Sequence, residues 1–175
     1  MISITTFLTY VGYFTTILFI LGVLWAAILW ARGIIPVLYR LGKGLSGNKI
    51  MIFAATDNAS SLENMLIESG LFQKQNISHI SSIDDLERTE GFSLFLVYWP
   101  DWEDNIRKIL TQKTKKTALI LYAPHVIDPA TGKPKIVPKE IMSELNEKLN
   151  ITLVNFRGRL LNDILVSMIT KSYQK

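Results

Sequence analysis

Residues 91–112, GFSLFLVYWPDWEDNIRKILTQ, contain the pattern that decides the fold. The stretch opens with a nearly continuous apolar run of strand length, and residues 101–112 then carry apolar side chains at helical spacing. Apolar runs without alternation are typical of parallel strands that are buried on both faces. The stretch therefore predicts one strand and one covering helix of an α/β sheet.

The same alternation recurs on both sides of this stretch. Further strands are predicted at residues 49–55, 76–80, 116–124 and 151–156. Helical patterns occupy residues 60–71, 82–90, 138–149 and 159–171. Five such units predict a Rossmann-like or flavodoxin-like three-layer α/β domain with a five-stranded, mainly parallel sheet in the order 2-1-3-4-5.

Residues 1–31 carry no charged side chain and are rich in Phe, Leu, Ile, Val, Trp and Ala. Because about 20 apolar residues suffice to cross a bilayer, they predict an N-terminal transmembrane helix. The alternative is a cleavable signal peptide, but no basic residue precedes the run, and the run exceeds the roughly 7–15 residues of a signal core. Residues 32–48 are then a basic juxtamembrane linker, in which Gly33 and Pro36 interrupt the helical pattern, and residues 49–175 are the soluble domain.

Basic residues cluster directly after the predicted span and account for the whole net charge of +4. They are Arg32, Arg40, Lys43 and Lys49. Together with Trp25 and Trp30 they are typical of a cytoplasmic membrane border. We therefore expect a single-pass protein of the bacterial inner membrane, with its N-terminus outside and its C-terminal domain in the cytoplasm. Such a cluster favours membrane lipid as the partner over sequence-specific nucleic acid.

One face of the predicted span is rich in small side chains at alternating steps of three and four. It includes Gly12, Thr15, Phe19, Gly22 and Ala26. Small residues let helix backbones approach closely within a membrane, so this face predicts a homo-oligomer. The alternative is that Gly and Ala are simply common in membrane helices.

Ligands of open parallel sheets bind beyond the carboxyl ends of the strands, which directs attention to the loops there. In the first loop, Asn58 or Ser60 is expected to cap the following helix, or else Asp57, Asn58 and Ser60 surround a helix start that binds an anion. The sequence contains neither GxGxxG nor GxxxxGK[ST], which argues against dinucleotide and ATP sites of the familiar kinds.

The loop after the third strand contains Trp99, Asp101 and Trp102. Either Asp101 caps the next helix, or the two indoles form an aromatic wall on which a base stacks, a contact of about 1–3 kcal/mol per base. Tyr122 and His125, which follow the fourth strand, would extend such a ligand site.

Arg157 and Arg159 follow the fifth strand. Either they pair with Asp163 and brace the loop, or their planar donor forks capture a phosphate or carboxylate. Loops one and five are separated in the predicted strand order. We therefore expect a shared site to involve the loop after the third strand or a neighbouring subunit.

No convincing nucleophile, base, metal cluster or cofactor motif accompanies these residues. His79, for example, has no carboxylate neighbour in its strand. The sequence thus favours a protein that is not an enzyme and holds no cofactor or metal.

Bacterial response-regulator receivers share the predicted fold, but they need acidic residues after the first and third strands and a lysine after the fifth. At these places the sequence has Ala54-Ala55, Tyr98-Trp99 and Phe156-Arg157, which argues against a phosphorelay. One span followed by a small Rossmann-like domain resembles the membrane-anchored effectors of prokaryotic antiviral defence, in which a CARF-like or TIR-like domain is tethered to the membrane.

The resemblance implies a membrane-anchored oligomeric effector or sensor. In such a protein a nucleotide second messenger, or a protein partner, rearranges the cytoplasmic domains and perturbs the membrane, for example by forming a pore. The alternative is a non-catalytic, membrane-tethered scaffold or interaction module of a larger membrane complex.

Overall fold

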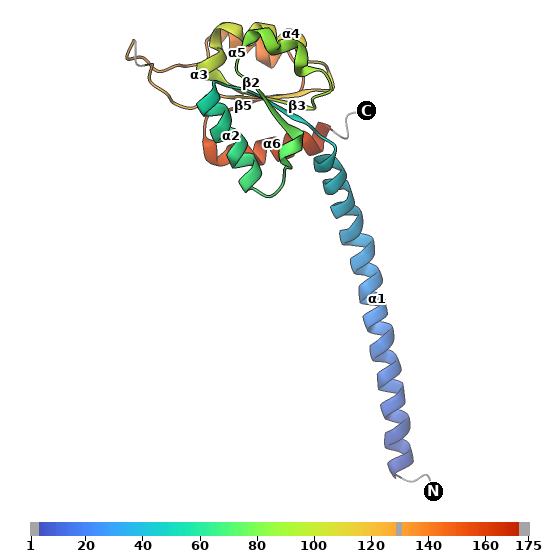
Figure 1. Cartoon of the computed structure of the whole chain (residues 1–175). Coiled ribbons are helices and arrows are strands. Elements are labelled where there is room, and N and C mark those ends of the chain that lie inside the picture. Colours follow the sequence, from blue (N-terminus) through green and yellow to red (C-terminus); the bar gives the residue numbers. More distant parts are fainter. Residues whose placement is uncertain (1–3, 129–130, 172–175) are drawn as a thin grey trace. The chain divides into compact units, whose positions relative to one another are not determined.

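The computed structural model describes residues 4–128 and 131–171 (Figure 1). It contains one long helix, α1 (Ile4–Ser46), and an α/β domain built on a five-stranded, all-parallel sheet. The chain divides into two compact units, residues 1–42 and 43–175. The predicted fold class is thereby confirmed.

The sheet has the predicted strand order, β2-β1-β3-β4-β5. Its strands are β1 (Ile50–Phe53), β2 (Ile77–Ile80), β3 (Leu94–Tyr98), β4 (Ala118–Tyr122) and β5 (Ile151–Val154). From β1 the chain first moves to one side, to β2, and then returns past β1 to β3. The gap between the carboxyl ends of β1 and β3 is therefore the switch point at which ligands of such sheets usually bind.

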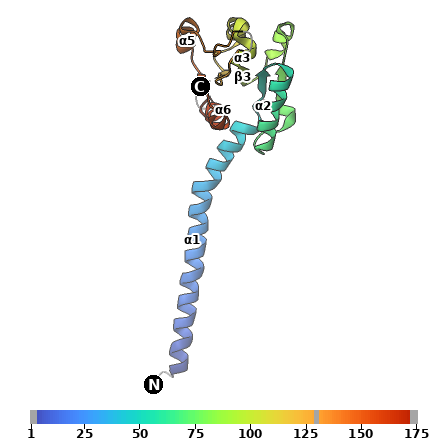
Figure 2. The same cartoon turned by 90° about the vertical axis from the view of Figure 1, so that its left-hand side faces the viewer.

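Helices cover both faces of the sheet and give three layers (Figures 1 and 2). One face is covered by α2 (Thr56–Glu68) and α6 (Arg157–Lys171), and the other by α3 (Trp99–Trp102), α4 (Ile106–Gln112) and α5 (Lys139–Asn146). Short 3₁₀ helices are η1 (Lys74–Asn76), η2 (Ile83–Thr89) and η3 (Glu103–Asn105). The placement of α2 and α6 on one face brings their N-terminal ends to the same edge of the sheet.

Each face of the sheet has its own apolar core, because successive side chains of a strand point to opposite faces. Ile52 of β1 packs with Leu62 of α2 and Ile164 of α6, whereas Phe53 packs on the other face with Phe95. All five side chains are almost fully buried, and burial of such a side chain stabilises the fold by about 1.5–3 kcal/mol.

Helix α1 does not break in the predicted linker. It continues through Gly33 and Pro36 as far as Ser46, so the prediction that these two residues interrupt the helix is wrong. A single proline removes one backbone donor and can be accommodated as a local kink when the flanking residues stay helical. Only residues 47–49 separate α1 from β1, and Leu45 already packs against the core under α2 and α6.

The part of α1 from Ile4 to Tyr39 is long and apolar enough to cross a membrane. The predicted small-residue face is exposed along it, and added methyl groups at Gly12 or Gly22 would meet nothing within 4 Å beyond the neighbouring backbone of α1 itself. The hydroxyl of Thr15 donates to the carbonyl of Gly12 at 3.0 Å, so this polar group is satisfied within its own helix, as apolar surroundings require.

Candidate functional site

The carboxylate of Asp101 closes the switch point between β1 and β3. Its Oδ2 atom accepts hydrogen bonds from the backbone nitrogen of Ala55, at 2.7 Å, and from Nδ2 of Asn58, at 2.9 Å. Asp101 lies in α3, whereas both donors lie at the start of α2. A protein carboxylate therefore occupies the place where a helix start would otherwise attract a ligand anion.

This arrangement corrects the predicted caps. Helix α2 begins at Thr56, four residues earlier than expected, so neither Asn58 nor Ser60 is its N-cap. The hydroxyl of Ser60 donates to the carbonyl of Thr56 at 2.9 Å inside the helix. Asp101 is not the cap of its own helix either, since α3 begins at Trp99 and the carboxylate points to α2. Asp57 is exposed in the first turn of α2.

Trp99 and Trp102 do not form an exposed aromatic wall. Their side chains are only 2 % and 3 % exposed and belong to the core under α3, α4 and α5. The indole of Trp102 meets the ring of Phe53 edge-on, with the ring centroids 5.5 Å apart. The two tryptophans lie in the short helix α3, which turns them towards the sheet instead of the solvent.

Tyr122 pairs with Tyr98 on the opposite face, under α2 and α6. The two ring centroids are 5.7 Å apart, and Tyr122 is almost fully buried. Burial raises the pKa of both phenols, and the nearby carboxylate of Asp101 raises the pKa of Tyr98 further, while the guanidinium of Arg157 opposes both shifts. Both tyrosines are therefore neutral at physiological pH and lie within electrostatic reach of Arg157.

Arg157 joins the start of α6 to α2. Its Nη2 atom donates to the carbonyl oxygen of Ser61, at 3.2 Å, and to the Ser61 hydroxyl, at 3.0 Å. The expectation that loops one and five stay apart within one subunit is therefore wrong. Strands β3 and β4 do lie between β1 and β5. However, the helix after β1, α2, and the helix after β5, α6, cover the same face of the sheet. Among the described residues, Asp163 forms no ion pair with Arg157 or Arg159.

The first turn of α6 contains Arg157 and Arg159, both exposed, and no acidic residue. The sequence placed these arginines in a loop, but the helix begins two residues earlier than predicted. The N-terminus of a helix carries a partial positive charge and unpaired backbone donors, so cations are unfavourable there and anions are stabilised. Within the described chain, no carboxylate forms an ion pair with either arginine.

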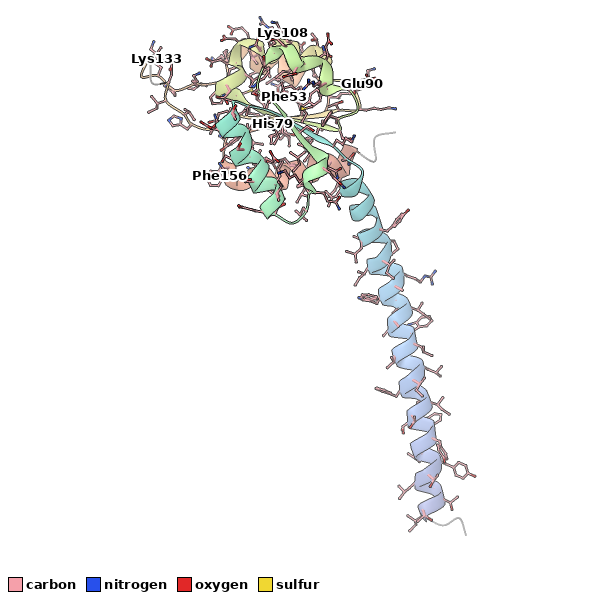
Figure 3. All side chains as sticks on the ribbon, viewed as in Figure 1. Phe53, His79, Glu90, Lys108, Lys133 and Phe156 are labelled. Carbon is pink, nitrogen blue, oxygen red and sulfur yellow. The ribbon has the colours of Figure 1, made fainter. Side chains whose placement is uncertain are left out.

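The sequence interpretation missed Phe156, which precedes Arg157. Its ring is 65 % exposed, and Figure 3 labels it at the junction of β5 and α6. An added Cβ at Gly158 would lie 2.7 Å from Cε1 of Phe156, so the ring lies directly against this glycine. The sequence FRGR contains the signal, namely an aromatic residue followed by a glycine that gives it room. The ring offers the exposed aromatic surface that the buried tryptophans do not provide.

His125 lies apart from the arginines. It borders a pocket of about 250 Å³ on the α5 side of the sheet, together with Lys135, Met142 and Leu153. The Lys135 ammonium is engaged there, since its Nζ donates to the Pro100 carbonyl at 2.9 Å and lies 3.3 Å from a Glu103 carboxylate oxygen. The predicted residues thus fall into separate places and do not form one pocket.

Further features of the described chain involve none of the predicted site residues. His79, predicted to lack a carboxylate neighbour, has its Nδ1 3.9 Å from Oε2 of Glu63 on α2. Within residues 4–128 and 131–171 there is no group of three or more potential metal ligands. A larger cavity, of about 570 Å³, lies at the amino ends of β3 and β4, bordered by Ser93 and Thr117, and contains none of the predicted site residues.

Comparison with models of known protein families finds no match, and comparison with curated proteins finds no similar sequence. The functional interpretation therefore rests on the chemistry of the carboxyl edge.

Proposed function

We propose that this protein is a membrane-anchored receptor whose α/β domain binds an anionic, nucleotide-type ligand at the start of α6. The observation that carries the proposal is the unbalanced positive charge of Arg157 and Arg159 in the first turn of that helix. A phosphate-bearing ligand would neutralise both guanidinium groups and bind the unpaired amides of the helix start.

The surroundings of the two arginines favour a ligand that has an aromatic part as well as a charge. The exposed ring of Phe156 adjoins Arg157 and offers a surface on which a base can stack. The neutral phenol of Tyr98 also lies within electrostatic reach of Arg157. Charge and stacking together favour a nucleotide over inorganic phosphate.

The same layer of the domain connects this edge to the long helix. Helices α2 and α6 begin at the carboxyl edge, where Arg157 contacts Ser61, and they cover a core against which the partly buried Leu45 of α1 also packs. A ligand that changes the contact between α2 and α6 therefore acts on a core in which the end of α1 takes part. This supports a sensor that reports binding to its anchor.

In this proposal α1 spans the cytoplasmic membrane of a bacterium, with the N-terminus outside and the domain inside. The apolar stretch of α1 and the basic residues that follow it support this topology. Copies associate through the face of Gly12, Gly22 and Ala26, and ligand-driven rearrangement of the oligomer perturbs the membrane.

The test is to titrate the full-length chain, reconstituted in lipid nanodiscs, with mononucleotides, dinucleotides and cyclic oligonucleotides. Wild-type chain should bind one of these ligands, and binding should weaken at least tenfold in Arg157→Ala and in Arg159→Ala. Arg88→Ala is the matched control, because it removes an exposed arginine from the other end of the domain. Equal binding by all three variants, or none by the wild type, would contradict the proposal.

A second test addresses the anchor. Gly22→Leu with Ala26→Leu keeps α1 apolar but blocks close approach of helices, so insertion should persist and the oligomer measured by sedimentation in detergent should become smaller. An unchanged oligomer would exclude this face as the contact.

The second candidate function is a membrane-tethered interaction module without a small ligand. The observation that favours it is Asp101, whose carboxylate already occupies the switch point. It predicts that no nucleotide binds and that substitutions at Arg157 change the capture of a protein partner only.

A further inference from the structure

The domain has two open sheet edges that are complementary in several respects. Among residues 4–128 and 131–171, strand β5 pairs only with β4, and β2 pairs only with β1. The Asn150 carbonyl accepts from Leu119 of β4, and the Val154 carbonyl accepts from Ala123, directly after β4. Alternation along the strand therefore directs the backbone groups of Ile151 and Leu153 outward. On β2 the Ile80 carbonyl accepts from Ala54, so His79 presents its backbone groups at the opposite edge.

The β5 edge lacks the features that normally prevent edge-to-edge association. Residues 149–156 contain no charged residue, no proline and no glycine. Leu149 is 72 % exposed and Leu153 is 39 % exposed, next to the pocket of about 250 Å³. Soluble proteins usually protect such edges with charges, prolines or bulges, because an unprotected edge pairs with another strand.

The two halves of the domain carry opposite charge, although the domain as a whole is nearly neutral. Residues 56–90, which contain α2, β2 and η2, have seven acidic and two basic residues. Residues 101–170, which contain β4 and β5, have eleven basic and eight acidic residues. The acidic half of one copy, which contains β2, and the basic half of another copy, which contains β5, therefore attract each other.

The direction of the strands selects between the ways of joining two edges. All five strands are parallel, and the chain enters the domain at the amino end of β1, directly after α1. Antiparallel pairing of two β5 strands would place these entry points at opposite edges of the joined sheet. Parallel pairing of β5 with β2 keeps the entry points of all copies at one edge of the joined sheet. This arrangement is required if the α1 helices of all copies are anchored in the same membrane.

We propose that copies of this chain assemble head to tail, with β5 of one domain adding in parallel to β2 of the next. The occupant of the β5 edge is thus a second copy, and the interface is heterologous, so it extends into a ring or a row. The inference rests on the membrane anchoring of the proposed function but is independent of the ligand. It places the oligomer contact in the domain in addition to the span.

The chain contains no cysteine, which makes cross-linking a direct test. The Ile151 side chain packs under α5, so the next side chain along β5, Thr152, points to the opposite face, which α2 and α6 cover. His79 of β2 lies on that same face, near Glu63 of α2. Full-length His79→Cys and Thr152→Cys variants are expressed singly, together in one membrane, and as a double variant, and are treated with a short bismaleimide. Ser143→Cys, exposed on α5, replaces Thr152→Cys in the matched control.

Head-to-tail assembly predicts covalent dimers when the two single variants are mixed and a ladder of multimers from the double variant. It predicts no dimer from either single variant or from the Ser143→Cys control mixed with His79→Cys. Dimers of Thr152→Cys alone would show β5 pairing with itself, and absence of dimers in the mixture would show no edge contact; either result overturns the inference. Alkaline carbonate extraction of the same membranes tests the anchoring separately, because a chain released by carbonate contradicts the proposed function itself.

Discussion

Two parts of the carboxyl edge differ in how their charge is balanced. Between β1 and β3, the backbone amide of Ala55 and the Asn58 side chain are both satisfied by Asp101. At the start of α6, the Arg157 side chain donates to neutral groups of Ser61, and no side-chain hydrogen bond or ion pair of Arg159 is found among the described residues. In this domain the protein itself fills the usual ligand position of the fold, and the neighbouring helix start carries two arginines without a carboxylate partner among the described residues.

The largest effect on stability is expected at Asp101, between β1 and β3. Asp101→Ala leaves the Ala55 amide and the Asn58 side chain without their acceptor, and the loss of charge-assisted hydrogen bonds costs about 1–3 kcal/mol of the free energy of unfolding. Thermal unfolding of the detergent-solubilised full-length chain should show a Tm lower by several degrees. Asp104→Ala, an exposed carboxylate in η3, is the control and should leave Tm nearly unchanged. Equal Tm values for both variants would show that Asp101 does not hold the edge together.

Sequence reasoning recovers the sheet because its signals are local. Each buried strand is an apolar run, each helix has its own periodicity, and together they predict the order and direction of the strands. The site depends instead on which helices cover the same face of the sheet, which is a non-local property. The contact between Arg157 and Ser61 could therefore not be predicted from local patterns. Helices α2, α3 and α6 begin before the first residues of their apolar pattern. The loops that precede these helices are therefore shorter in the structure than the sequence predicts.

The tryptophans illustrate a further limit. An aromatic residue at the end of a strand has the same sequence signature whether it faces the core or the solvent. Trp99 and Trp102 are buried, while Phe156, in the corresponding place after β5, is exposed. The difference arises because α3 turns its side chains onto the sheet, whereas Gly158 leaves space for the Phe156 ring beside α6.

The next largest effect, on the affinity for a nucleotide, is expected at Phe156. Replacing the ring by Ala should weaken nucleotide binding roughly tenfold, because one stacked base contributes about 1–3 kcal/mol. Phe156→Tyr should retain most of the affinity, since it keeps an aromatic face. Fluorescence titration of the full-length chain with the ligand found in the nucleotide panel measures both. An Ala variant that binds as tightly as the Tyr variant would remove the ring from the site.

A smaller effect, on stability at alkaline pH, is expected from Tyr98 and Tyr122. Because the pKa of Tyr98 and Tyr122 is raised in the folded domain, their phenols stay protonated at a pH at which the unfolded chain already ionises. Their contribution to stability is therefore complete below about pH 10 and is lost as the pH rises above it. Tyr98→Phe should reduce this alkaline loss, as measured by Tm between pH 9 and 11. An identical slope in the variant would show that Tyr98 does not contribute.

The central claim is that the arginines of α6 bind an anion and do not merely brace the fold. The most direct measurement is Tm and nucleotide affinity on the same preparations of Arg157→Ala, Arg157→Lys, Arg159→Ala and Arg159→Lys. The account predicts Tm shifts equivalent to less than about 1 kcal/mol, at least tenfold weaker binding by the Ala variants, and poor recovery by Lys, which keeps the charge but lacks the planar donor fork. A fall in Tm large enough to explain the lost binding, restored by Lys, would contradict it.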